Sequence, residues 1–234
     1  MNKNIEIMIK LQDYWTNVIN AVFAADRFKK DIRYLQAKLE EHENNCTEFT
    51  ETTAKYRRTI KNKENDLSAL EQKIKKLNER KNLLKTQREV DAFESELKEL
   101  KKESGILESE LISLMDILIE KETLLAGMTK ELENQKSDTA LSLAKLSSDI
   151  KTNEETAALN KEKYNALLGG LEAAYLQRFD KLLKSKNGKA VGEVQDEVCG
   201  VCNFKIPSHL ASDAIYDDKV IQCTNCGSYI YRLS

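Results

Sequence analysis

The chain has 234 residues, of which 32% are charged and 6% aromatic, and its formal net charge is −2. This balance excludes a polyelectrolyte that would seek nucleic acid through its overall charge. The only proline is Pro207, and only four glycines precede Gly188, so the turns that a globular domain places every dozen residues or so are missing. The composition therefore predicts very long helices.

A first apolar stripe begins near the amino terminus. Steps of four and three residues from Ile7 lead through Leu11, Tyr14 and Val18 and continue in the same phase to Leu84. The plainly polar members of this stripe are His42, Thr53, Lys63 and Lys81. A repeat of 3.5 residues sustained over this length is typical of a coiled-coil seam.

A second stripe follows in a new phase. It begins at Val90 and reaches Leu132, slips like a stutter near 132–139, and resumes from Leu143 to Leu167. Two stripes of similar length indicate either two arms of one hairpin or one long rod with a phase break. The rod would pair as a straight parallel dimer.

The break between the stripes favours the hairpin. Thr86 and Glu89 match a capping box, which marks the start of a helix. Residues 55–88 carry 12 Lys/Arg and 4 Asp/Glu, whereas residues 89–122 carry 4 Lys/Arg and 11 Asp/Glu. Folding the chain at a tip near 85–89 lays these opposite charges side by side. We therefore predict an antiparallel hairpin over 1–184.

Helical character weakens after the second stripe. Gly169 and Gly170 predict a bend near 169–170, and the pattern then continues to about 184. Residues 185–198 are predicted as a linker with a short strand between Gly188 and Gly192. Residues 199–234 form the last predicted domain, and we expect its core to be independent of the hairpin core.

Four cysteines dominate that last domain. They form two C-x2-C pairs with twenty residues between the pairs: Cys199, Cys202, Cys223 and Cys226. Two intervening residues let both thiolates of a pair reach one tetrahedral ion at about 2.3 Å. Gly200 and Gly227 suit the tight backbone of such knuckles, and "KVIQC" and "SYIYRL" favour strands. The pattern predicts a β zinc ribbon that folds around one structural Zn²⁺.

Other uses of the cysteines fit less well. Two disulfides would require an oxidising compartment, and a redox C-x-x-C pair would require a thioredoxin-like βαβ context. Catalytic zinc keeps an open position that four thiolates would close, and an iron–sulfur cluster is the remaining alternative for four cysteines. His209 could replace a cysteine ligand, but a turn residue beside Pro207 is the simpler interpretation.

Three further features admit both structural and functional interpretations. Cys46 and His42 fall on the first stripe, where a small buried thiol and a register-fixing polar residue are favoured over a partner-linked or pH-linked role. The basic block 55–63 could contact phosphates, although pairing with the acidic arm explains it as well. A separate possibility is that two copies of the hairpin associate as a homodimer.

The ribbon is predicted to contact protein. Lys205, Lys219 and Arg232 balance Asp213, Asp217 and Asp218, whereas nucleic-acid ribbons usually display a basic face. Its apolar residues exceed what so small a core can hide: Phe204, Ile206, Ile215, Tyr216, Tyr229, Ile230 and Tyr231. Some are expected to pack on the adjoining helix and others to be exposed anchors.

No enzyme is predicted. The sequence has no P-loop, dinucleotide-binding turn or nucleophile elbow, and two histidines leave few candidates for a general base. The amino terminus does not resemble a signal peptide, and no apolar run approaches the roughly 18 residues that span a bilayer. We therefore expect a cytoplasmic protein without membrane insertion.

The quoted features together resemble a known family. The tip "TQREVDAFESELKELKKE", the segment "YLQRFDKLLKSKNGKAVGEV" and the knuckles "CGVCNFKIP" and "CTNCGSYIYRL" resemble the bacterial family of coiled-coil hairpins with a C-terminal C4-type zinc ribbon. This family includes flagellar proteins of spiral bacteria and chlamydial relatives linked to type III secretion. The resemblance places the four cysteines on the family's zinc ligands, and Ile206-Pro207 on its post-knuckle turn.

The resemblance also implies a function. It suggests a non-enzymatic adaptor or chaperone that binds the sigma-54 factor and type III secretion or flagellar export components, with RNA binding in some relatives. One departure limits the transfer. The family often has arginine and leucine after the last glycine, where this chain has Ser228-Tyr229, so a contact made by that arginine does not carry over.

Overall fold

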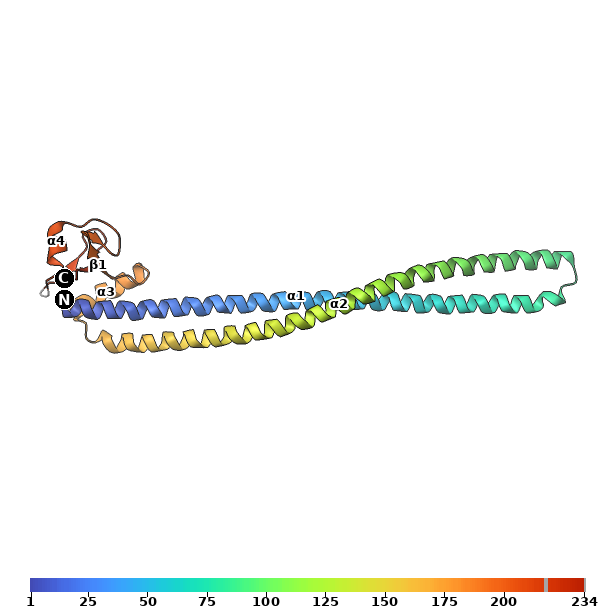
Figure 1. Ribbon diagram of the computed structural model, residues 1–234, viewed down its shortest axis with the longest axis horizontal. Coiled ribbons are helices and arrows are strands. Elements are labelled where there is room, and N and C mark those ends of the chain that lie inside the picture. Colours follow the sequence, from blue (N-terminus) through green and yellow to red (C-terminus); the bar gives the residue numbers. More distant parts are fainter. Residues whose placement is uncertain (217–218, 234) are drawn as a thin grey trace. The chain divides into compact units, whose positions relative to one another are not determined.

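The computed structural model describes residues 1–216 and 219–233. Two long helices precede a small sheet, which confirms the mainly α fold class with a small C-terminal β region (Figure 1). The elements in chain order are α1 (Lys3–Arg80), the 3-10 helix η1 (Lys81–Leu83), α2 (Gln87–Leu168), α3 (Ala173–Ser185), β1 (Val191–Gln195), β2 (Val198–Cys199), α4 (Ser208–Asp213), β3 (Ile221–Gln222) and β4 (Tyr229–Tyr231). Asp217 and Asp218, counted in the ribbon charge balance, lie outside the described residues.

The chain forms two compact units. One contains Leu35–Leu141, and the other joins Met1–Tyr34 to Ser142–Ser234. Both long helices contribute to both units. The second unit also holds all the smaller helices and strands after α2.

In the unit Leu35–Leu141, α1 and α2 pack along the two predicted stripes. The most buried side chains there all lie on stripe positions: Thr53, Ile60, Leu70, Phe93, Ser104 and Leu111. Where the second stripe slips, Leu132, Gln135 and Thr139 are the half-buried positions, as a stutter requires. Lys81 departs from the prediction, because it lies in η1 and is exposed.

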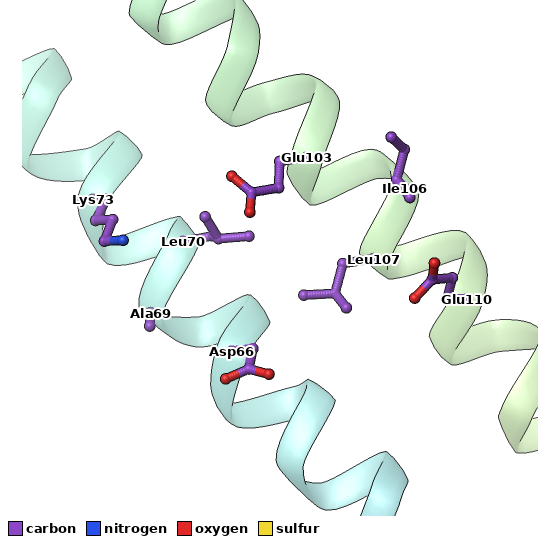
Figure 2. Close-up of a pocket in the computed structure, with 8 residues that line it drawn as sticks. All are labelled: Asp66, Ala69, Leu70, Lys73, Glu103, Ile106, Leu107 and Glu110. Atoms are coloured by element: carbon purple, nitrogen blue, oxygen red, sulfur yellow. The ribbon is translucent and has the colours of Figure 1, made fainter.

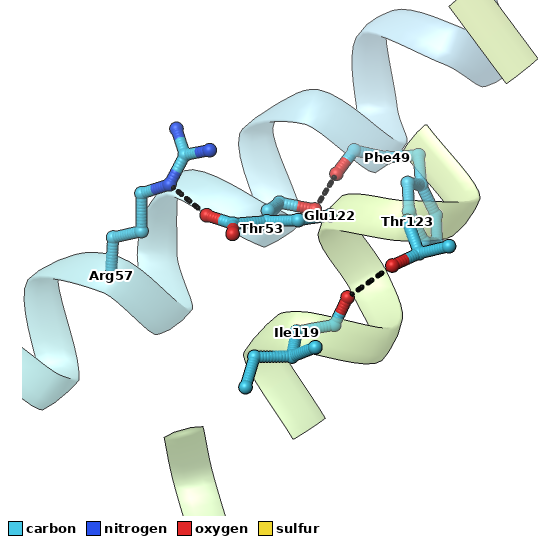
Figure 3. A network of polar contacts seen from close by, with 6 residues as sticks. All are labelled: Phe49, Thr53, Arg57, Ile119, Glu122 and Thr123. Atoms are coloured by element: carbon cyan, nitrogen blue, oxygen red, sulfur yellow. Dashed lines mark hydrogen bonds and ion pairs between the residues drawn. The ribbon is translucent and has the colours of Figure 1, made fainter. Parts of the chain in front are cut away.

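Polar residues on the seam are accommodated individually. Thr53 is only 1% exposed, and its hydroxyl donates to the Phe49 carbonyl at 2.9 Å (Figure 3). The Lys121 ammonium of α2 lies 5.2 Å from the ring centre of Phe49 and 5.0 Å from that of Tyr56. The Thr53 hydroxyl thus keeps a hydrogen-bond acceptor, and the Lys121 ammonium keeps favourable contacts with two aromatic rings, although both lie among apolar side chains.

Ion pairs join the basic and acidic stretches across the seam, as the charge pattern predicted. Arg57 binds Glu122 at 2.7 Å (Figure 3), and Lys63 binds Glu110 at 2.5 Å. Arg57, Glu110 and Glu122 are exposed and Lys63 is half-buried, so each pair contributes at most about 1 kcal/mol to stability. Their main effect is therefore on the orientation and register of the two arms.

The tip of the hairpin lies at residues 81–86, slightly before the predicted 85–89. Leu84 continues the heptad spacing but has an extended backbone (φ −72°, ψ 129°), so the stripe outlasts the helix. The capping box is confirmed. The Glu89 carboxylate accepts from the backbone N–H of Thr86 at 2.9 Å, and the Glu89 N–H donates to the Thr86 hydroxyl at 3.3 Å.

In the other unit, the start of α1 forms the centre of a core. Ile5, Met8 and Leu11 are at most 2% exposed and belong to one cluster with residues from α2, α3 and the sheet. The other buried members of the cluster are Ile7, Tyr164, Leu171, Phe179, Leu182, Leu183, Ala190, Val191 and Tyr229. The expectation that hairpin and ribbon have independent cores is therefore wrong, because Tyr229 and Val191 of the sheet pack with α1.

The sheet is small and mixed. Its strand order is β2-β1-β4-β3, with β1 parallel to β4 and the other two pairs antiparallel. Its second face covers a separate core formed by Val194, Cys199, Ile206, Ala211, Cys223 and Ile230. The predicted short strand is present as β1, which begins three residues after Gly188 and includes Gly192.

Two polar side chains of α1 fasten the C-terminal elements. The Gln12 side-chain oxygen accepts from the N–H groups of Ala190 at 2.6 Å and Val191 at 2.7 Å, and its amide donates to the Val191 carbonyl at 3.0 Å. The Asn4 amide donates to the Glu172 carboxylate at 2.8 Å, just before α3. Neither contact was evident from the sequence, because nothing local to Asn4 or Gln12 marks a partner about 170 residues away.

Candidate metal centre

The two cysteine pairs have the same backbone hydrogen bonds. The N–H of Cys199 donates to the Phe204 carbonyl, and the N–H of Cys223 donates to the Ser228 carbonyl, at 3.0 and 2.8 Å. In each pair the carbonyl of the first cysteine accepts from the residue four positions later, Asn203 or Gly227, at 2.8 Å. The two segments are thus equivalent knuckles, as the C-x2-C spacing predicted.

The left-handed position of each knuckle differs from the sequence-based interpretation. It is occupied by Asn203 (φ 56°) in the first knuckle and Gly227 (φ 71°) in the second. Asparagine tolerates this conformation better than most residues, so it replaces the glycine expected there. Gly200 instead allows the first knuckle to pack closely against β1, because a Cβ at this position would lie only 2.5 Å from the Glu193 carbonyl oxygen.

The four thiols converge. Their sulfur atoms all lie within 4.8 Å of one another. Across the knuckles the Sγ–Sγ distances are 3.9 Å for Cys199 and Cys226 and 3.8 Å for Cys202 and Cys223. A tetrahedral zinc ion with bonds of about 2.3 Å requires sulfur atoms about 3.8 Å apart. The residues present therefore fit one Zn²⁺, held by Cys199, Cys202, Cys223 and Cys226.

The same distances argue against disulfides, whose sulfurs lie about 2.05 Å apart. Burial raises the pKa of the metal-free Cys199 thiol to about 12. Burial also opposes ionisation of Cys226, but hydrogen bonds from the hydroxyl and backbone of Ser228 lower the pKa of this thiol to about 6. Zinc binds thiolates, so it displaces the thiol protons and its affinity for the site depends on pH.

Helix α3 places two cations beside the second knuckle. The Lys186 ammonium, just after the helix, donates to the Cys226 carbonyl and to the Ser228 hydroxyl, the latter at 3.1 Å. Arg178 donates to the Gly227 carbonyl at 3.1 Å. Four thiolates around Zn²⁺ carry a net charge of −2, so nearby cations and hydrogen-bond donors stabilise the loaded site. These contacts were not predicted, since residues 178 and 186 lie outside the cysteine motif.

The other residues considered as ligands or switches lie elsewhere. His209 is exposed on α4 and is not part of the sulfur cluster. Cys46 and His42 are half-buried on the α1 seam. Their placement agrees with the structural interpretation, in which they are seam residues of the coiled coil.

The ribbon surface divides as predicted. Ile206, Tyr229 and Ile230 are at most 2% exposed, whereas Phe204 (54%) and Tyr216 (58%) remain largely exposed. Ile215 and Leu233 are also exposed. Their preceding neighbours in the chain are joined by a backbone hydrogen bond, in which the N–H of Arg232 donates to the Ala214 carbonyl. Nearby charges are paired, Lys205 with Glu197 at 3.5 Å and Lys219 with Asp213 at 3.4 Å.

The basic block 55–63 is largely engaged with carboxylates. Arg57 and Lys63 bind acidic residues of α2, and Lys61 lies 3.5 Å from Glu64 of α1. Within the described part of the chain, Lys55 and Arg58 form no ion pair. Most of the block therefore serves the hairpin, which supports the pairing interpretation.

A groove of about 420 Å³ lies between α1 and α2 in the unit Leu35–Leu141 (Figure 2). Leu70 and Leu107 form its apolar floor, and its rim carries Asp66, Lys73 and Glu103. Ala69, Ile106 and Glu110 complete the lining. The lining thus combines an apolar floor with charged side chains at the rim. No helix in the described ranges is long and apolar enough to cross a membrane.

The fold and the four-cysteine cluster define a class: an α-helical coiled-coil protein with a C-terminal C4 zinc ribbon. In agreement, residues 198–230 match the family model of a C4-type zinc ribbon domain. No curated protein sequence matches the chain.

Solved structures are similar over nearly the whole chain. CT398 from Chlamydia trachomatis superposes with a TM-score of 0.83 at 18% identity, covering 98% of both chains. A protein from Mycobacterium smegmatis gives a TM-score of 0.74 at 14% identity, covering 99% of this chain and 100% of that one. The HP0958 protein from Helicobacter pylori gives 0.55 at 15% identity, covering 99% and 98%. At these identities the similarity establishes the fold.

Proposed function

We propose that this protein is a non-enzymatic, cytoplasmic adaptor that binds other proteins through its ribbon and its coiled coil. The observation that carries this proposal is the surface of the ribbon. Phe204 and Tyr216 are more than half exposed beside paired charges, on a domain that has its own buried core. Exposed aromatic residues on a folded, metal-fixed scaffold are typical anchors of protein interfaces.

The proposed partners are the sigma-54 factor and components of type III secretion or flagellar export. Their identity comes from the family resemblance of the knuckles and tip. The fold similarity to CT398 supports membership of this structural group. The balanced charges of the ribbon support a protein partner over a polyanion.

The test is a binding titration of the zinc-loaded chain against purified sigma-54 factor. Three variants are measured alongside it. Cys223→Ser removes a metal ligand, whereas a double change of Phe204 and Tyr216 to Ser keeps the metal site. Leu159→Ser, at a 51% exposed position of α2, is the control. We expect the first two variants to lose binding and the control to retain it. Absence of binding by the unchanged chain at micromolar concentration would refute this partner.

Nucleic-acid binding by the block 55–63 is the alternative, and the observation in its favour is that Lys55 and Arg58 form no ion pair among the described residues. It predicts binding of RNA or DNA that weakens steeply with salt and falls when Arg57 and Arg58 are replaced by Ala. Undetectable binding at low salt would eliminate this alternative.

A further inference from the structure

One segment of α2 concentrates the exposed apolar surface of the protein. Of the sixteen large apolar side chains that are exposed among the described residues, six lie between positions 106 and 124. They are Ile106, Ile112, Met115, Ile117, Ile119 and Leu124. The α1 residues from 35 to 80 contribute none. A helix that is apolar beyond its seam has more than one face to cover.

Three of these residues form a stripe of their own. Ile112, Met115 and Ile119 occupy positions i, i+3 and i+7 of α2, so they share one face of the helix. Ile112 and Ile119 are each 62% exposed, and Met115 is 38% exposed. Figure 3 shows Ile119 on the side of its turn away from Phe49 and Thr53 of α1. This "outer stripe" therefore lies beside the hairpin seam and is not part of it.

The charges around the outer stripe are acidic. Glu110 and Glu122 of this segment bind cations of α1, and Lys121 lies over two aromatic rings of the seam. By contrast, Glu108, Asp116 and Glu120 form no ion pair with any described basic residue; Glu108 accepts a hydrogen bond from Ser104. The outer stripe thus combines apolar anchors with uncompensated negative charge.

We propose that the outer stripe docks an amphipathic helix of a partner protein, apolar on one face and basic along its flanks. Two isoleucines and a methionine at i, i+3 and i+7 suit the apolar anchors of a helix laid alongside. Lysine or arginine on its flanks would meet Asp116 and Glu120. A second copy of this chain is a poorer occupant. Pairing two outer stripes would oppose like charges, and the basic face of α1 offers no exposed apolar anchors.

The experiment uses the full-length, zinc-loaded chain and a fluorescent helical peptide of about three heptads, with leucine at the a and d positions and lysine elsewhere. The test variant changes Ile112 and Ile119 to Ser. The matched control changes Leu141 and Leu159 to Ser, at α2 positions that are 70% and 51% exposed. Both pairs are exposed, so circular dichroism should show unchanged helicity in both variants.

We expect saturable binding by the unchanged chain and the control, and at least about tenfold weaker binding by the Ile112 and Ile119 variant. Changing Asp116 to Asn and Glu120 to Gln should weaken binding severalfold and reduce its dependence on salt. Equal affinity of the two serine variants would overturn the proposal. So would a dimer, detected by light scattering, that only the Ile112 and Ile119 variant dissociates, because the occupant would then be a second copy. The outer stripe belongs to the unit Leu35–Leu141, so this test is independent of the ribbon and of the sigma-54 titration.

Discussion

Gln12 offers the sharpest test of how the C-terminal elements are held on α1. Its side chain satisfies two N–H groups and one carbonyl at the start of β1, where Ala190 is 0% and Val191 3% exposed. Gln12→Leu preserves size but removes all three hydrogen bonds. An unsatisfied buried polar group costs about 1–3 kcal/mol. Three groups lose their partner, and the Gln12 side chain is itself only half-buried. We therefore take the low end of this range for each group and expect local opening of β1 to become easier by about 3 kcal/mol.

The assay is amide hydrogen exchange at Ala190 and Val191. A change of about 3 kcal/mol corresponds to roughly 100-fold faster exchange through local opening. Gln12→Glu should give an intermediate effect, because a carboxylate still accepts from both N–H groups but cannot donate to the Val191 carbonyl. Gln36→Leu, an exposed position of α1, is the matched control. If Gln12→Leu leaves both exchange rates unchanged, the bonds seen here do not stabilise β1.

Four further outcomes are expected. Cys223→Ser should abolish zinc binding, measured by metal analysis. It should also make amide hydrogen exchange faster in the ribbon and at Met8 and Leu11. Residues 35–141 should keep their helicity, because they have their own seam. Thr53→Val should leave urea stability equal or higher by up to about 1 kcal/mol, because the hydroxyl bonds only to its own helix and leaves no partner unsatisfied. Gly227→Ala should weaken zinc retention against a chelator, because φ of 71° costs alanine about 1–2 kcal/mol. Backbone hydrogen bonds from Lys85 and Thr86 lower the pKa of Glu89 in the folded chain. The stabilisation of the α2 start is therefore fully present above the unfolded pKa of this residue and is lost as pH falls through its folded pKa. Glu89→Gln should remove this pH dependence from amide exchange at the tip.

The hairpin was predictable because its information is periodic. Each stripe repeats over many heptads, so single polar members such as Thr53 or Lys63 do not obscure the phase. The opposite charges of the two arms then identify the antiparallel arrangement, and Arg57–Glu122 is one realised pair. The end of α1 was harder to locate, because Leu84 keeps the heptad spacing although the helix has already ended.

The cysteine cluster was predictable from spacing alone, but its surroundings were not. A C-x2-C pair determines knuckle geometry locally, whereas the second knuckle is contacted by Arg178 of α3 and by Lys186, just after that helix. The role of Asn203 was hidden for a different reason. Glycine is the expected residue at a positive φ, and Gly200 is the only glycine near the first cysteine pair. Gly200 was therefore matched with Gly227, although Asn203 has the positive φ. Hydrogen bonding, rather than residue type, identifies the equivalent position.

Strand β4 links the metal site to the start of α1. Successive residues of a strand face opposite sides of a sheet: Tyr229 packs in the core with Ile5 and Met8, and Ile230 packs in the ribbon core with Cys223. Loss of zinc removes the bonds that hold the second knuckle, and the knuckle leads directly into β4. We expect loosening of β4 to withdraw Tyr229 from the α1 core in the same step. Metal binding and packing of the ribbon against α1 are therefore linked equilibria, so tighter packing at Tyr229 should raise zinc affinity as well as helix stability.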